Sequence, residues 1–161
     1  MNITVFRIDD RLIHGQIVTA WLHYADAKQI VVADDKAAND SFSQSLLKMA
    51  TPKGIKLRIV NLSDGKKLVE ESDSDDKTLF LVRGPVEANS VLENNDVVKT
   101  INVGNLNMRK GKEKILDNLW VYEEDIEAFK DLNGKKIDLE YRTVPSDQSQ
   151  SVINLLEKNN K

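Results

Sequence analysis

Residues 3–25 of the chain read ITVFRIDDRLIHGQIVTAWLHYA. The apolar run at residues 3–8 predicts a buried strand, and apolar side chains spaced three and four residues apart predict a helix over residues 14–25. A charged loop lies between the two. A strand that passes through a short loop into a helix is typical of a sheet whose strands are joined by crossover helices.

The rest of the chain continues this alternation. Further strands are predicted at residues 29–33, 56–61, 78–82, 100–103, 119–122 and 137–142. Further helices are predicted from about residue 40 and at residues 64–71, 85–94, 124–132 and 149–158. Several strands are nearly continuous Val, Ile and Leu, as expected where helices cover both faces. We therefore expect the α/β class, with a single open, mostly parallel seven-stranded sheet and helices on both faces.

Apolar and charged side chains outside the strands give further expectations about packing. The helix that begins near residue 40 is expected to pack through an apolar stripe of Phe42, Leu46, Leu47 and Met49. Three aromatic rings are expected in the core rather than stacked on a sugar, those of Trp21, Tyr24 and Trp120. The acidic run at residues 70–76 is expected to be a solvated loop.

Composition excludes several classes of function. The chain has 161 residues, 40% apolar and 30% charged, which predicts one globular domain spanning residues 1–161. Its net charge of −3 provides no overall positive field for nucleic acid or an anionic membrane, and the absence of cysteine excludes disulfides and thiol nucleophiles. No apolar run approaches the roughly 20 residues that span a bilayer, and no secretory signal is visible. We expect a cytoplasmic protein.

The loop after the first predicted strand is the densest cluster of reactive residue types. Ligands of open α/β sheets bind outside the carboxyl ends of the strands, where this loop lies. Arg11 supplies a planar cation that matches phosphate oxygens, and Gly15 lets an anion approach the backbone at a helix start. His14 lies between them in sequence, and histidine as a residue type offers a nucleophilic ring nitrogen at cellular pH. The cluster suits transfer of a phosphoryl group onto imidazole.

Two assignments within this cluster stay open from the residues alone. Asp10 or Asp9 could fix the imidazole tautomer of His14 by a hydrogen bond, and the spacing does not choose between them. A purely structural role for His14 is the alternative to a reactive one. His23 is interpreted as structural or exposed, and two histidines make a zinc site hard to assemble, so no metal is expected. Weaker loop segments at residues 34–36, 83–85 and 104–106 could form the walls of a pocket.

The segment FRIDDRLIHGQIVTAWL, residues 6–22, resembles the active-site signature of the mannose/fructose/sorbose family of phosphotransferase-system (PTS) IIB subunits. The resemblance continues in order along the chain, through VVADD at residues 31–35, RGPVEA at 83–88, INVGN at 101–105, EEDIEAF at 123–129 and YRTVPSD at 141–147. It covers essentially the whole sequence. It departs from the family pattern after INVG, where Asn105 and the stretch LNMRKGK at residues 106–112 leave the contacts of that loop open.

The resemblance implies an open α/β domain with a seven-stranded sheet and a phosphotransferase activity without a nucleotide or metal cofactor. It implies that His14 accepts a phosphoryl group from a cytoplasmic IIA domain and donates it to a sugar bound by the membrane IIC and IID subunits. Arg11 and the amides of Gly15 and Gln16 would then hold the phosphoryl group. The choice between Asp10 and Asp9 as the orienter of the imidazole stays open. The protein would be attached peripherally to the membrane through IIC and IID. The sugar and the oligomeric state stay open.

A receiver-like signalling or interaction domain is the alternative from a different class of function, because acidic residues also end the first strand of response regulators. Such a domain would carry a phosphorylatable Asp at the end of its third strand, where this chain has Val60, Asn61 and Leu62. A phosphohistidine phosphatase would need Arg directly before its histidine, and here Ile13 precedes His14.

Overall fold

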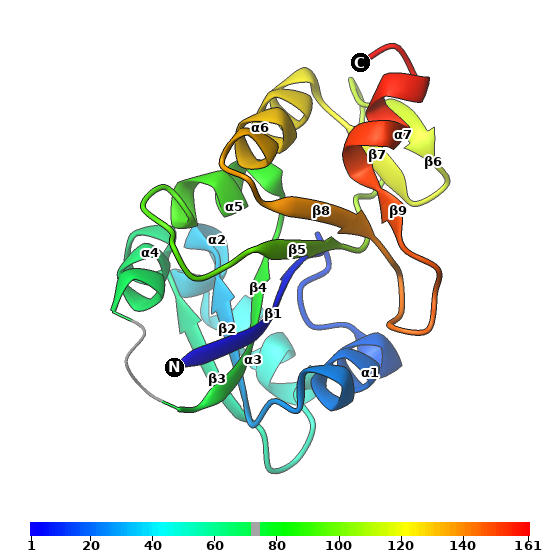
Figure 1. Ribbon diagram of the computed structural model, residues 1–161. Coiled ribbons are helices and arrows are strands. Elements are labelled where there is room, and N and C mark those ends of the chain that lie inside the picture. Colours follow the sequence, from blue (N-terminus) through cyan, green and yellow to red (C-terminus); the bar gives the residue numbers. More distant parts are fainter. Residues whose placement is uncertain (72–74) are drawn as a thin grey trace.

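The computed structural model describes residues 1–71 and 75–161 and contains one large sheet with helices on both sides (Figure 1). Seven strands form this sheet in the order β3-β2-β4-β1-β5-β8-β9, and all neighbouring strands are parallel except the antiparallel pair β8 and β9. The strands are β1 (Asn2–Ile8), β2 (Gln29–Ala33), β3 (Lys56–Val60), β4 (Lys77–Val82), β5 (Thr100–Val103), β8 (Asp138–Tyr141) and β9 (Gln150–Ser151). The expected fold class is confirmed.

The helices divide between the two faces of the sheet. They are α1 (Gly15–Ala25), α2 (Asp35–Ala38), α3 (Ser41–Ala50), α4 (Leu62–Glu70), α5 (Pro85–Val91), α6 (Glu123–Gly134) and α7 (Val152–Lys158). Buried side chains of α1, α2 and α3 form one apolar cluster with the sheet, whereas those of α4, α5, α6 and α7 belong to the cluster on the other face. Covering both faces explains why the central strands are apolar at nearly every position.

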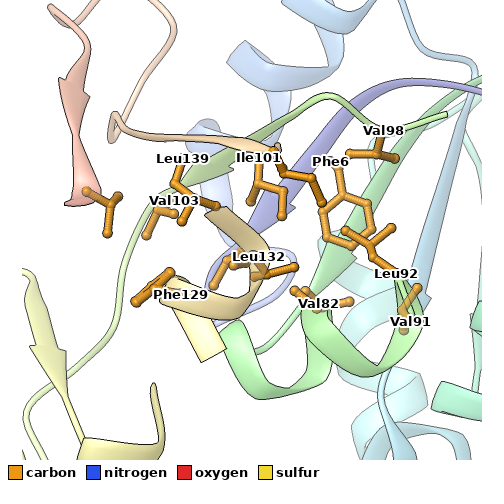
Figure 2. Packing of buried hydrophobic residues seen from close by; sticks show 14 of the residues in the cluster. Phe6, Val82, Val91, Leu92, Val98, Ile101, Val103, Phe129, Leu132 and Leu139 are labelled. Carbon is orange, nitrogen blue, oxygen red and sulfur yellow. The ribbon is translucent and has the colours of Figure 1, made fainter. Parts of the chain in front are cut away.

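The strands contribute alternate side chains to the two clusters, as the pleat of a strand requires. In β4, Leu79 and Leu81 belong to the cluster that contains α1, and Phe80 and Val82 belong to the cluster with α5 and α6. Figure 2 shows this second cluster, with apolar side chains of α5 and α6 against those of β1, β4, β5 and β8. The ring of Phe6 stacks on that of Phe80 with centroids 5.0 Å apart, which ties β1 to β4.

The seventh strand of the sheet is not the one predicted. Residues 119–122 do form a strand, β7 (Leu119–Val121), but it pairs with β6 (Glu113–Leu116) in a separate two-stranded antiparallel sheet. The two-residue turn at Asp117 and Asn118 closes this hairpin locally, so β7 needs no place in the large sheet. β9 takes the seventh place, where a helix start was predicted at residue 149.

The expected apolar stripe of α3 is largely wrong. Leu47 is buried against the sheet, but Phe42, Leu46 and Met49 are exposed, Phe42 by 69% and Met49 by 82%. α3 follows the short helix α2 and begins at the cap residue Asp40, whose carboxylate accepts a hydrogen bond from the Phe42 amide. Of the α3 side chains, only Leu47 is buried, Ala50 is partly buried against the same cluster, and the rest of the expected stripe faces outward.

The expectations about the aromatic rings and the acidic run are confirmed only in part. Trp21 is buried as predicted. Tyr24 is 58% exposed, although its ring makes a T-shaped contact with that of Trp21 at a centroid distance of 5.5 Å, and Trp120 is partly exposed. Within the acidic run, residues 72–74 lie outside the described residues, and the flanking Glu71, Asp75 and Asp76 are exposed. Among the described residues, no helix combines the length and apolar character needed to cross a membrane.

We predict that Gly65→Ala lowers the free energy of unfolding by about 1–3 kcal/mol. A Cβ at residue 65 would lie 2.7 Å from the Cβ of Ala33, because α4 approaches β2 closely there. This overlap opposes the intrinsic preference of helices for Ala over Gly, which is about 1 kcal/mol. Urea denaturation measures the difference. Gly134→Ala is the control, since nothing lies within 4 Å of a Cβ at that position in α6. Equal stability of Gly65→Ala and the unmodified protein would contradict the close approach.

Candidate active site

The predicted loop lies where the chain diverges to the two faces of the sheet. β1 lies between β4 and β5; it leads into α1 on one face, whereas β4 leads into α5 on the other. Loops that separate in this way leave a crevice outside the carboxyl ends of the strands, the usual ligand site of open α/β sheets. The loop of residues 9–14 follows β1 at this end of the sheet, as the sequence predicted.

His14 is exposed at the start of α1. It is the N-cap residue, with extended backbone angles (φ −142°, ψ 107°), and its side chain makes no capping hydrogen bond. Leu12 and Ile13, directly before it, are buried in the cluster under α1. Left-handed backbone angles at Leu12 (φ 58°) and Gly15 (φ 49°) turn the chain on either side of His14. Two buried side chains thus anchor the loop while the imidazole stays accessible.

Arg11 forms a bidentate pair with Asp9. Its Nε donates to Asp9 Oδ1 at 3.0 Å and its Nη2 to Asp9 Oδ2 at 2.9 Å, and the backbone amide of Arg11 also donates to Oδ1 at 3.0 Å. These hydrogen bonds to the carboxylate raise the pKa of Arg11 above its ordinary value. The Arg11 side chain keeps 24% of its surface exposed, so the guanidinium lies at the rim of the site.

Asp10 holds the loop that follows β5. Its Oδ1 accepts hydrogen bonds from Nδ2 of Asn105 and Nδ2 of Asn107, each at 3.0 Å, and its Oδ2 accepts from the Asn107 amide at 2.5 Å. The Asp10 amide in turn donates to the Asn105 carbonyl at 2.9 Å. These bonds define the loop whose contacts the sequence left open. Both carboxylates of the cluster have partners other than His14, so orientation of the imidazole by Asp10 or Asp9 stays a prediction.

A second ion pair joins the ends of β2 and β4. Arg83 donates from Nε and Nη2 to the two oxygens of Asp34, at 3.1 and 3.0 Å, and from Nη1 to the Asp10 carbonyl at 3.0 Å. Asp34 also caps α2 by accepting from the Ala37 amide at 3.0 Å. Burial by itself raises the pKa of Asp34, but the hydrogen bonds from Arg83 and Ala37 outweigh it, and the pKa lies below the ordinary value.

Two cavities flank the Arg83 side chain. The larger, about 520 Å³, is lined by several of the loop residues that the sequence suggested as pocket walls, among them Lys36, Arg83, Pro85 and Leu106, and also by Asp10. The smaller, about 250 Å³, lies between the loop at Arg11 to Ile13 and the start of α3, with Leu46 and Leu47 on its far wall. Arg83 therefore lines both cavities, whereas the exposed His14 at the start of α1 lines neither of them. His23 is exposed on α1, as expected.

Comparison with known proteins assigns the family. A family model described as "PTS system sorbose subfamily IIB component" matches residues 3–161. The chain belongs to this family of IIB components. It is 34% identical over 161 residues to the sorbose-specific EIIB component of Klebsiella pneumoniae, covering 99% of this chain and 96% of the relative. It is 32% identical to the mannose-specific EIIAB component of Escherichia coli (strain K12), covering 98% of this chain and 49% of that protein.

A solved structure agrees with this assignment. The crystal structure of the IIBSor domain of the Klebsiella pneumoniae sorbose permease superposes with a TM-score of 0.92 at 31% identity, covering 98% of both chains. IIB components are phosphotransferases that transfer a phosphoryl group to sugar during PTS uptake, and they work together with IIA and IIC/IID components. Nothing supports the receiver-like alternative. At the end of β3 of this IIB component, Asn61 caps α4 by accepting from the Asp64 amide.

Sequence reasoning missed several residues that shape the site. Arg7 lies on β1 beneath the loop and binds Asp9, and Gly104 provides the space for its guanidinium. Asn107 binds Asp10 with both its backbone and its side chain. The sequence did carry a signal for Arg7. It is a charged residue inside the apolar run TVFRI, and a buried arginine requires acceptors nearby. No comparable signal marks Asn107, whose role depends on a contact 97 residues away in sequence.

We predict that Asp34→Asn lowers the free energy of unfolding of this IIB component by about 1–2 kcal/mol at pH 7, because the ion pair with the partly exposed Arg83 is lost. Asn still caps a helix, so the α2 cap is retained. The folded-state pKa of Asp34 is lowered, so its contribution is present above the unfolded pKa of about 3.9 and disappears as the pH falls through the folded value.

Urea denaturation at several pH values measures this deficit, which is expected to be constant from pH 7 to about pH 5 and to shrink toward pH 3. Asp117→Asn is the control, because the Lys114–Asp117 pair is exposed and such pairs contribute little. A deficit that grew on acidification would contradict the assigned direction.

Proposed function

We propose that His14 is the residue of this IIB component that carries the phosphoryl group. The observation that supports this most directly is an exposed imidazole held at the start of α1 by the buried Leu12 and Ile13. A ring nitrogen of His14 would attack the phosphorus atom of a phosphohistidine on the donor. The new N–P bond forms as the old one breaks, and the donor imidazole leaves. In the second step a sugar hydroxyl attacks the same phosphorus atom, His14 becomes free imidazole, and the hydroxyl proton passes to solvent or a nearby base.

The charge of the transferred group would be balanced by α1 and Arg11. Val18 has the first backbone amide of α1 that forms a helical hydrogen bond, which it donates to the His14 carbonyl. The amides of Gly15 and Gln16 precede it, at the positive end of an 11-residue helix. Phosphoryl transfer depends mainly on such positioning and charge stabilisation. Arg11 adds a planar cation at the rim of the site, whose two donors match two phosphoryl oxygens.

The donor we propose is a IIA domain, and the acceptor is a sugar held by the IIC and IID subunits. One relative is named an EIIAB component, and this name supports a close association of the IIA and IIB functions. In this scheme residues 1–161 act as one domain on the cytoplasmic side, attached to the membrane through IIC and IID, without nucleic acid, nucleotide or metal. Self-association and the identity of the sugar are not part of the proposal.

His14→Ala is expected to abolish phosphorylation by the cognate phosphorylated IIA domain, because no other residue of the proposed site offers a ring nitrogen. Mass spectrometry of acid-labile phosphate measures the label. His23→Ala, an exposed histidine on the same helix, is the matched control and is expected to be labelled at the normal rate. Undiminished labelling of a folded His14→Ala variant would refute the assignment.

Arg11→Lys is expected to reduce the rate of phosphoryl transfer by more than tenfold, which corresponds to about 1.4 kcal/mol in the barrier. Lysine keeps the positive charge but loses the two-pronged geometry that a phosphoryl group requires. Single-turnover transfer from phosphorylated IIA measures the rate. If the rate is unchanged, another group must balance the phosphoryl charge.

A further inference from the structure

Arg7 is a buried cation directly beneath the site loop. It is 2% exposed, and its guanidinium lies over the ring of Trp21, 4.8 Å from the ring centroid. A Cβ at residue 104 would overlap the guanidinium, so glycine at that position creates the space it occupies. Burial lowers the pKa of Arg7 to about 10 even though Asp9 opposes the shift, and the residue stays charged at neutral pH. A buried charge of this kind persists in a fold only where its surroundings satisfy it.

Each terminal nitrogen of Arg7 donates to two acceptors, and together these come from the end of β1, from β5 and from the segment after β8. Nη1 donates to the Asn102 side chain on β5 and to the Arg142 carbonyl at 3.0 Å. Nη2 donates to Asp9 Oδ2 and to the Thr143 carbonyl, each at 3.1 Å. The guanidinium therefore has a fixed position, unlike that of Arg11 at the exposed rim.

Asp9 is shared between these two guanidiniums. It is 1% exposed, and its Oδ2 accepts from Nη2 of both Arg7 and Arg11. If the Arg11 side chain turned toward a phosphoryl group, Oδ2 would keep Arg7 and Oδ1 would keep the backbone amide of Arg11. Without Arg7, the same movement would leave a buried carboxylate without a cation, which is strongly unfavourable.

We propose that Arg7 is a positioning residue that acts through Asp9 and frees Arg11 to move between Asp9 and the phosphoryl group. Arg11 rests on Asp9 when His14 is unmodified and binds the phosphoryl group when it is present. Arg7 stays on Asp9 throughout and balances the buried charge, so the exchange requires only that Arg11 replace one anionic partner with another. Arg7 itself does not touch the phosphoryl group. The inference rests on the proposed role of Arg11.

The test is a double-mutant cycle on single-turnover transfer from phosphorylated IIA to the full chain. Arg7→Met is expected to slow transfer about tenfold, because Arg11 then remains on Asp9 as its sole cationic partner, and tenfold corresponds to about 1.4 kcal/mol. In an Arg11→Ala background, Arg7→Met is expected to change the rate less than twofold. A loss of equal size in both backgrounds would overturn the proposal, since a general structural defect is additive with Arg11→Ala.

A matched control separates this effect from loss of a buried polar group. Gln29 is 3% exposed on β2 and donates to the Thr78 hydroxyl at 3.0 Å. Gln29→Met is expected to reduce stability without slowing transfer. If Arg7→Met does not fold, Gly104→Ala is the second variant, because it displaces the Arg7 guanidinium while keeping both charges. Transfer by folded Gly104→Ala at the normal rate would also overturn the proposal.

A spectroscopic measurement reports on Arg11 directly. The Nε–H resonance of Arg11, observed by ¹⁵N NMR, is expected to shift on phosphorylation in the unmodified protein and to stay at its Asp9-bound position in Arg7→Met. A shift of equal size in both proteins would contradict the inference. The same variants show which proposal fails. If Arg11→Ala transfers at the normal rate while His14→Ala is unlabelled, the proposed role of His14 is retained and the proposed roles of Arg11 and Arg7 are both wrong.

Discussion

The buried pair of Arg7 and Asp9 is the interaction on which the architecture of the site depends. Two full charges lie beneath the loop, almost without solvent contact. Their desolvation is offset because both terminal nitrogens of the guanidinium are hydrogen-bonded, to one carboxylate and to acceptors from two other segments. These acceptors bring together the end of β1, the strand β5 and the connection between β8 and β9, through Asn102, Arg142 and Thr143. Trp21 adds α1 to the same cluster, since its indole N–H donates to the Thr143 carbonyl.

Burial and exposure alternate along the site loop. Asp9 and Asp10 are buried and hydrogen-bonded, Arg11 is at the rim, Leu12 and Ile13 are buried again, and His14 is exposed. A loop anchored at so many points loses little conformational entropy when a partner binds, because that entropy was already lost on folding. The rigid segment ends in an imidazole at the start of a helix. This arrangement suits a side chain that would receive a phosphoryl group from one protein and pass it on. The likeness to IIB components supplies the chemical context for this geometry.

Departures of the structure from the sequence predictions have a common cause in long-range packing. The strand at Leu119 to Val121 was correctly expected, but its place in the sheet was not, because a local hairpin competes with pairing to a distant strand. The helical periodicity of α3 was also correctly recognised, yet Phe42 and Met49 are exposed. Periodicity reports which residues share a helix face, and it does not report whether another element covers that face. The same limit applies to Asp10, whose partners Asn105 and Asn107 lie beyond any local pattern.

By itself the sequence determined the α/β class, the positions of most strands and helices, and the family, and it singled out the loop of the proposed site. These follow from local patterns and from a motif, which need only neighbouring residues to be recognised. Tertiary structure alone decided the strand order, the composition of the small second sheet and the ion pair of Arg83 with Asp34. It also decided that Asp9 joins Arg11 to the buried Arg7. Those features depend on which charged and polar groups come into contact after the chain has folded. Such contacts are strong because they are buried, and the spacing of residues in the sequence does not indicate them.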